Sequence, residues 1–217
     1  MSLIKASKFF HYWTAFTADQ IILPTDCPTL EDLWEWDKEW TKATIGTTHS
    51  ANTNSPFGNF MKERLGHEWD YWNEDRNVDL ALAKEECMRF TSFQDSNYDP
   101  MHGNFYPPVY DVLIEHKAAG SISWQEMVKL IHMRAKLKVV ITYTWDEGDK
   151  RSQPLIEHMT KAFGDMIAQA NEVWPENGDT RYLLIFGQKG KDELYWIGTE
   201  FNAAGAVQEM MRKTTPL

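Results

Sequence analysis

Cysteine is scarce in this chain: only Cys27 and Cys87 occur among its 217 residues, and no CxxC spacing is present. Two such thiols do not supply the disulfide framework of a small secreted domain or the paired cysteines of a zinc finger. The N-terminus also lacks the apolar core of a secretory signal. We therefore expect reduced thiols and a cytoplasmic protein.

Long apolar runs and nucleotide-binding motifs are also missing. No apolar stretch approaches the ~18 residues that a membrane-spanning helix requires, so we expect no membrane partner. There is no GxSxG, P-loop or GxGxxG motif. The glycines at 187 and 190 indicate a hairpin turn rather than a phosphate cradle, because no helix follows them.

Basic residues are outnumbered: 22 Lys and Arg face 32 Asp and Glu, for a formal charge of −10. This charge argues against broad, non-specific binding to nucleic acid. It favours a selective substrate, a homodimer or a partner that delivers the substrate. The basic side chains that we consider for phosphate contact are Lys117, Lys129, Arg134, Lys136, Lys138, Lys150 and Arg151.

The residues that are abundant indicate a folded globular protein. Hydrophobic residues make up 42% of the chain, and ten tryptophans supply large aromatic anchors. The length suits a single domain, and no linker or repeat divides the chain. We expect an N-terminal helical extension over 1–56, a core over 57–145, and a C-terminal part over 146–217 that completes the sheet.

Hydrophobic periodicity and turn residues predict a succession of helices and strands. Thr29 to Asp32 and Ser123 to Glu126 have the spacing of capping boxes that open helices. The expected helices comprise a short one before residue 21 and others at 29–40, 57–65, 123–134, 154–174 and 203–212. The expected strands cover 21–23, 67–73, 78–83, 109–117, 138–144, 181–186 and 194–199. A helix over 78–90 remains open as an alternative, because its residue types also favour that structure.

The strand at 109–117 carries the most informative pattern. Side chains alternate across a strand, so Asp111, Leu113, Glu115 and Lys117 share one face. Glu115 and Lys117 would thus lie side by side at the end of the strand. Taken alone, such a pair is typical of a surface ion pair that contributes little stability. The elements before and after it change that interpretation.

The order from residue 57 is helix, three strands, helix and strand, and Asp79 lies on the second of these strands. This pattern resembles the PD-(D/E)xK superfamily, the restriction-endonuclease-like nucleases. The residues that carry the resemblance run from Arg76 to Leu82 and from Val112 to Lys117, within 57–145. The chain departs from the family pattern at Val78, where proline is usual. The gap before Glu115 is also long, which predicts an insertion over 84–106.

The resemblance implies an α/β fold with a mixed central sheet flanked by helices, and a site built from a few residues. Asp79 and Glu115 would hold Mg²⁺ or Mn²⁺, with the backbone carbonyl of His116 as a further ligand. Lys117 would orient or deprotonate the attacking water. Glu63, on the preceding helix, would hold a second metal ion or else form a surface ion pair. Gln125, early in the next helix, would face the site or else lie exposed.

The chemistry agrees with this set of residues. Two carboxylates on adjacent strands form a hard-oxygen site suited to Mg²⁺ or Mn²⁺, and a bound metal lowers the pKa of water and polarises a phosphate. Asp111 is a poorer partner for Glu115, because four residues along one strand span ~13 Å. A zinc site at His116 and His132 matches no ligand spacing.

We therefore expect a metal-dependent nuclease acting on DNA, with RNA as the alternative substrate. Two alternatives remain: a catalytically inactive relative that serves as an interaction module, and an unrelated phosphate-handling hydrolase.

Overall fold

A seven-stranded sheet forms the centre of the protein. The structure is a computed structural model, which describes residues 4–35, 37–46, 55–75, 78–84, 110–117 and 123–217. The strands lie across the sheet in chain order. They are β1 (Trp69–Asp75), β2 (Val78–Lys84), β3 (Tyr110–Lys117), β4 (Ala135–Tyr143), β5 (Arg181–Lys189), β6 (Glu193–Asn202) and β7 (Val207–Pro216).

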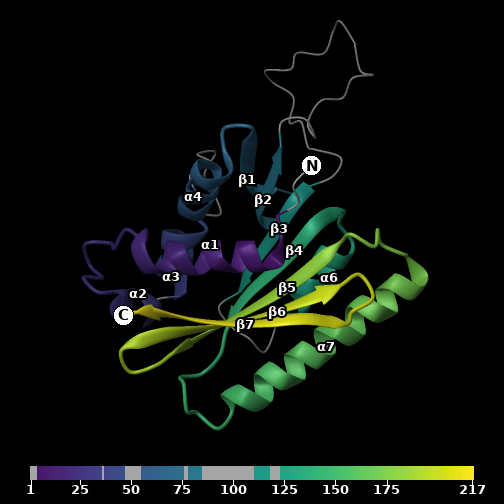
Figure 1. Ribbon diagram of the computed structural model, residues 1–217. Helices are drawn as coiled ribbons and strands as arrows, with labels where there is room; N and C mark the ends of the chain where they lie inside the picture. Colours follow the sequence, from purple (N-terminus) through teal and green to yellow (C-terminus); the bar gives the residue numbers. More distant parts are fainter. Residues whose placement is uncertain (1–3, 36, 47–54, 76–77, 85–109, 118–122) are drawn as a thin grey trace, which may run out of the picture.

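The sheet combines parallel and antiparallel strand pairs. β3, β4 and β5 run parallel, and the other neighbouring pairs are antiparallel. Parallel neighbours need a crossover connection, which helices α6 (Trp124–Ile131) and α7 (Ser152–Val173) supply. The prediction of an α/β protein with a mixed central sheet flanked by helices is confirmed (Figure 1).

Helices cover both faces of the sheet (Figure 1). Those that precede the sheet are α1 (Ala6–Asp19), α2 (Leu30–Glu35), α3 (Asp37–Thr44) and α4 (Pro56–Leu65). α1 packs on β5, β6 and β7, while α6 packs on β3, β4 and α7. Each face of the sheet therefore has its own hydrophobic core. The predicted N-terminal extension supplies helices to one of these cores.

Strand β3 shows how alternation serves both cores. Val112 and Ile114 pack in the core that contains α1, whereas Leu113 packs in the core that contains α6 and α7. Glu115 and Lys117 share the face of Leu113, as the alternation predicts, and contact residues of α6. The expected insertion over 84–106 falls almost wholly outside the described residues.

Local signals set several helix ends. The Thr29 hydroxyl donates to Asp32 at 2.6 Å and accepts from the Asp32 backbone N–H at 3.1 Å, which forms the predicted capping box before α2. Ser55 caps α4 by accepting a hydrogen bond from the Gly58 N–H at 3.0 Å. Gly66 ends α4 with a φ of 110°, a conformation that side chains disfavour.

The predicted helix over 203–212 is wrong, because this segment turns and then forms β7. Gly205 adopts a φ of 76° in the turn, and a Cβ there would meet the Gly164 carbonyl oxygen. From Val207 the chain pairs antiparallel with β6. Pairing with a neighbouring strand thus overrides the helical preference of the residues.

The predicted strand at 21–23 is also wrong. These residues follow the end of α1 and pair with no strand among the described residues. Ile22 is 84% exposed, and only Ile21 of this segment packs against the core. A short apolar run therefore did not indicate a strand here.

An aromatic cluster fills the face of the sheet beneath α1 and α3. Trp13 meets the rings of Trp196 and His116 at centroid distances of 5.6 and 6.2 Å. The Trp40 indole N–H donates to the Tyr143 hydroxyl at 2.5 Å, and that hydroxyl lies 2.5 Å from His116 Nε2. Because the Tyr143 oxygen accepts from Trp40, its own proton is available to His116 Nε2.

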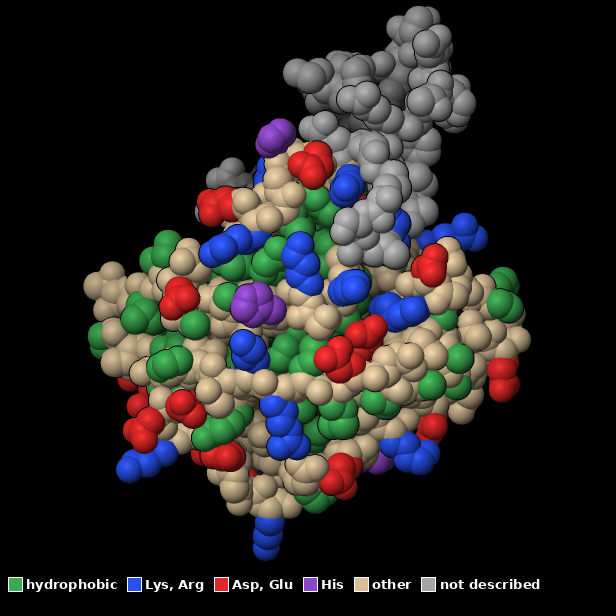
Figure 2. All heavy atoms as spheres, viewed as in Figure 1, with side chains coloured by type: hydrophobic (Ala, Val, Ile, Leu, Met, Phe, Trp, Pro, Cys, Tyr) green, Lys and Arg blue, Asp and Glu red, His purple; other side chains and the backbone are tan. Residues whose placement is uncertain are grey.

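Charged side chains of both signs are interspersed on the face seen in Figure 2, with hydrophobic side chains between them. No field of a single sign dominates the described part of that face. Among the described helices, none combines the length and apolarity that crossing a bilayer demands.

The buried hydroxyl of Tyr143 gives a test of this cluster. Tyr143→Phe leaves the Trp40 N–H and His116 Nε2 without their shared partner, so we expect a loss of about 1–3 kcal/mol in the free energy of unfolding. Urea unfolding would measure it. Tyr12→Phe is the matched control, since the Tyr12 hydroxyl makes no hydrogen bond within the described residues. Equal stability of both variants would contradict the proposed role.

Candidate active site

Asp79 and Glu115 lie next to each other on neighbouring strands. In the antiparallel pairing of β2 and β3, Leu80 lies opposite Ile114, and one further step along this register places Asp79 beside Glu115. The backbone N–H of His116 donates to Asp79 Oδ2 at 2.6 Å. The two carboxyl groups are thus held together at the end of β3.

Helix α6 brings two further charges to this pair, Glu126 and Lys129, and the end of β3 brings a third, Lys117. Lys129 Nζ lies 3.0 Å from Glu115 Oε1 and 2.5 Å from Glu126 Oε2. Lys117 Nζ lies 3.6 Å from Glu126 Oε1. We call Asp79, Glu115, Lys117, Glu126 and Lys129 the carboxylate–lysine cluster. It joins β2, β3 and the first turns of α6.

Burial dominates the electrostatics of the two strand carboxyl groups. Burial, reinforced by the neighbouring Asp79, raises the pKa of Glu115 to about 9, although Lys129 acts in the opposite direction. Burial also raises the pKa of Asp79, against the lowering effect of the His116 N–H. Adding positive charge would therefore favour the ionised form of both groups.

Two carboxylate oxygens of the cluster could accept further hydrogen bonds. Glu115 Oε1 and Glu126 Oε2 are buried and accept no hydrogen bond of good geometry within the described residues. The Lys129 ammonium lies in contact with both oxygens. Although burial acts to lower the pKa of Lys129, its contacts with Glu126 and Glu115 raise it. The site is therefore suited to a cation.

The backbone and the side chain of His116 make contacts on opposite faces of the sheet. Its backbone holds Asp79, while its imidazole lies in the aromatic core, where Nδ1 is 3.4 Å from the Thr41 hydroxyl. Burial lowers the pKa of this imidazole to about 3, so it is neutral at ordinary pH. The proposed metal ligation by the His116 carbonyl stays a prediction.

Two other predicted site residues have exposed side chains. Gln125 is exposed on α6, and its neighbour Glu126 is buried and faces the cluster. Glu63 is exposed on α4. Their proposed roles stay predictions. Sequence reasoning assigned Glu126 only to a capping box, although the Ser123 side chain makes no capping hydrogen bond. The i, i+3 spacing of Glu126 and Lys129 was the available signal.

Several basic residues considered for phosphate contact are paired elsewhere. Lys136 lies 2.6 Å from buried Asp111, whose other oxygen accepts the Lys84 backbone N–H at 3.1 Å. Lys138 is completely buried and pairs with Glu176, so it cannot meet a phosphate at the surface. Asp111 is thus an ion-pair partner within the fold rather than a partner of Glu115.

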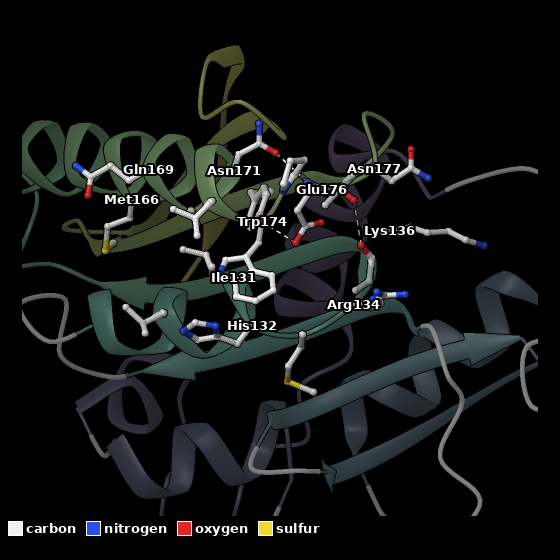
Figure 3. Close-up of a pocket in the computed structure, with 18 of the residues that line it drawn as sticks. Ile131, His132, Arg134, Lys136, Met166, Gln169, Asn171, Trp174, Glu176 and Asn177 are labelled. Atoms are coloured by element: carbon white, nitrogen blue, oxygen red, sulfur yellow. Dashed lines mark hydrogen bonds between the residues drawn. The ribbon is translucent and has the colours of Figure 1, made fainter.

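A groove of about 1110 Å³ lies between α6 and α7, toward their C-terminal ends. Figure 3 shows Ile131 and His132 on the α6 side and Met166 and Asn171 on the α7 side. Trp174, which follows α7, is 76% exposed beside the groove. The carboxylate–lysine cluster does not line this groove.

The arrangement fits a divalent cation only in part. Within the described residues, no group of three or more His, Cys, Asp or Glu side chains is arranged to hold a metal ion. Asp79 is partly buried and Glu115 is buried, and Mg²⁺ commonly binds one or two carboxylates and keeps several waters. The pair therefore fits an ion that retains much of its water shell.

No protein-family model matches the chain, and no curated protein matches its sequence.

The raised pKa of Glu115 gives a pH-dependent prediction. A carboxyl group with a raised native pKa contributes stability at low pH that is lost as the pH rises toward about 9. Glu115→Gln cannot ionise, so its melting temperature should exceed that of the wild type at pH 8 by at least about 2–4 °C and match it near pH 5. Thermal unfolding in chelator would measure this. Glu63→Gln, which replaces an exposed carboxylate, is the control variant. A Glu115→Gln variant less stable than the wild type at pH 8 would contradict the raised pKa of Glu115.

Proposed function

We propose that this chain is a restriction-endonuclease-like, metal-dependent nuclease that hydrolyses phosphodiester bonds of DNA, with RNA as the alternative substrate. The observation that carries the proposal is the convergence of Asp79 and Glu115 at the end of β3, with Lys117 on the same face. The succession of α4, β1, β2, β3, α6 and β4 supports it, because it follows the order of elements that the resemblance implies.

The residues would divide the work as follows. Asp79 and Glu115 would hold Mg²⁺ or Mn²⁺, which supplies a polarised phosphate and a water of lowered pKa. Glu115 would lose its proton as the cation binds, since positive charge favours the carboxylate. Lys117 would stabilise the negative charge that develops on the phosphate. Its present contact with Glu126 keeps its ammonium near the carboxyl pair.

Cleavage of supercoiled plasmid and single-stranded DNA with Mg²⁺ or Mn²⁺ tests the proposal. We expect Asp79→Asn, Glu115→Gln and Lys117→Met each to reduce the cleavage rate at least about 100-fold. Lys191→Met is the matched control for Lys117→Met, because Lys191 is exposed in the turn before β6. Equal activity in the wild type and the three site variants would show that these residues do not form the active site.

A second candidate function is a non-catalytic interaction module of the same fold. It is favoured by the exposed apolar residues beside the groove, where Trp174 and Val173 are 76% and 70% exposed. Exposed aromatic residues are common anchors of protein interfaces. Lys129 would then serve as a permanent counter-ion of the carboxyl groups.

The two functions differ in their response to metal. A nuclease with a working site should be stabilised by Mn²⁺, because an ion that binds only the folded state raises the melting temperature. The interaction module should show no such rise. Thermal unfolding with increasing Mn²⁺ distinguishes them, and Asp79→Asn controls for binding elsewhere on the acidic surface.

A further inference from the structure

Lys129 is the member of the carboxylate–lysine cluster whose ammonium contacts two buried carboxyl oxygens while part of its side chain is exposed. Its ammonium lies within 3.0 Å of Glu115 Oε1 and 2.5 Å of Glu126 Oε2, which are both buried. Yet 41% of the Lys129 side chain is exposed, whereas 1% of the Glu115 side chain is. The charged head is therefore inside the cluster while part of the side chain lies at the surface.

We propose that Lys129 is a tethered cation that holds the place of the divalent metal ion next to Glu115. In the metal-free chain its ammonium occupies the position beside Glu115 Oε1. A divalent ion binds there when that ammonium withdraws into solvent. The inference rests on the proposed function, because it takes Asp79 and Glu115 as the carboxylates that hold the metal.

Glu126 serves as the anchor of this tethered cation. It lies one helical turn before Lys129 on α6, so the pair is held by the helix itself. Its other oxygen, Oε1, lies 3.6 Å from Lys117. Glu126 thus contacts both lysines, which accounts for its burial at the start of α6 without a capping hydrogen bond.

The charges of the cluster favour this role for Lys129. Three carboxyl groups face two ammonium groups, so full ionisation leaves an excess of one negative charge. Removing the Lys129 charge leaves an excess of two, which equals the charge of a divalent ion. An ammonium in contact with Glu115 would also repel a metal ion bound there.

Lys117 offers the matched comparison. It carries the same charge and belongs to the same cluster, but it contacts Glu126 and sits on the strand. Its removal changes the net charge equally and leaves the ammonium beside Glu115 in place. A tethered cation predicts that the two lysines differ in their effect on metal affinity, whereas a general charge effect predicts that they do not.

The test measures Mn²⁺ binding to the full chain without substrate. Calorimetry and the electron-spin signal of free Mn²⁺ both report this binding. We expect Lys129→Met to bind Mn²⁺ at least about tenfold more tightly than the wild type, and Lys117→Met to differ from the wild type by less than about threefold. The rise in melting temperature caused by Mn²⁺ should be larger in Lys129→Met. Lys129→Gln, which keeps a polar head group, serves if Lys129→Met does not fold.

Three other results would overturn either the role of Lys129 or the metal site. Unchanged or weaker Mn²⁺ binding in both Lys129 variants would overturn the role of Lys129 and leave the metal site standing. Equal tightening by Lys117→Met and Lys129→Met would also overturn it, in favour of a general charge effect. Absence of Mn²⁺ binding in the wild type and in every lysine variant would overturn the proposed metal site itself.

Discussion

The parallel pairing of β3 with β4 is the constraint on which the arrangement of the site depends. Parallel neighbours require a crossover, and α6 is that crossover, packed on β3 and β4. The helix must therefore begin near the end of β3, where Glu115 lies. Its first turns, which carry Glu126 and Lys129, then meet the strand carboxyl groups. The charged cluster is a product of this topology.

The position of the strand residues in the site followed from simple rules. Period-two alternation placed Glu115 and Lys117 on one face, and the order of the elements placed Asp79 on the neighbouring strand. The structure adds the register, which decides that Asp79 lies beside Glu115 and not two residues away. Sequence patterns identify the face of a strand well but seldom its register with a partner distant in the chain.

The helix residues were harder to place because a helix turns by about 100° per residue. An uncertainty of one residue in where α6 faces the sheet exchanges Gln125 for Glu126. β7 posed another difficulty, since most of its side chains are exposed on an edge strand and carry no alternation. Lys138 pairs with Glu176, 38 residues away, and nothing local in the sequence indicates that pairing.

One residue links the two layers of the protein. The His116 ring is fixed among Trp13, Tyr143 and Thr41, and its backbone N–H fixes Asp79 on the opposite face. A rotation of this segment that moved the His116 ring would also move the backbone N–H that holds Asp79. The packing of the tryptophan-rich layer therefore determines how precisely the carboxylate–lysine cluster is positioned. Its conservation in any relative of this chain would report demands of geometry as much as demands of stability.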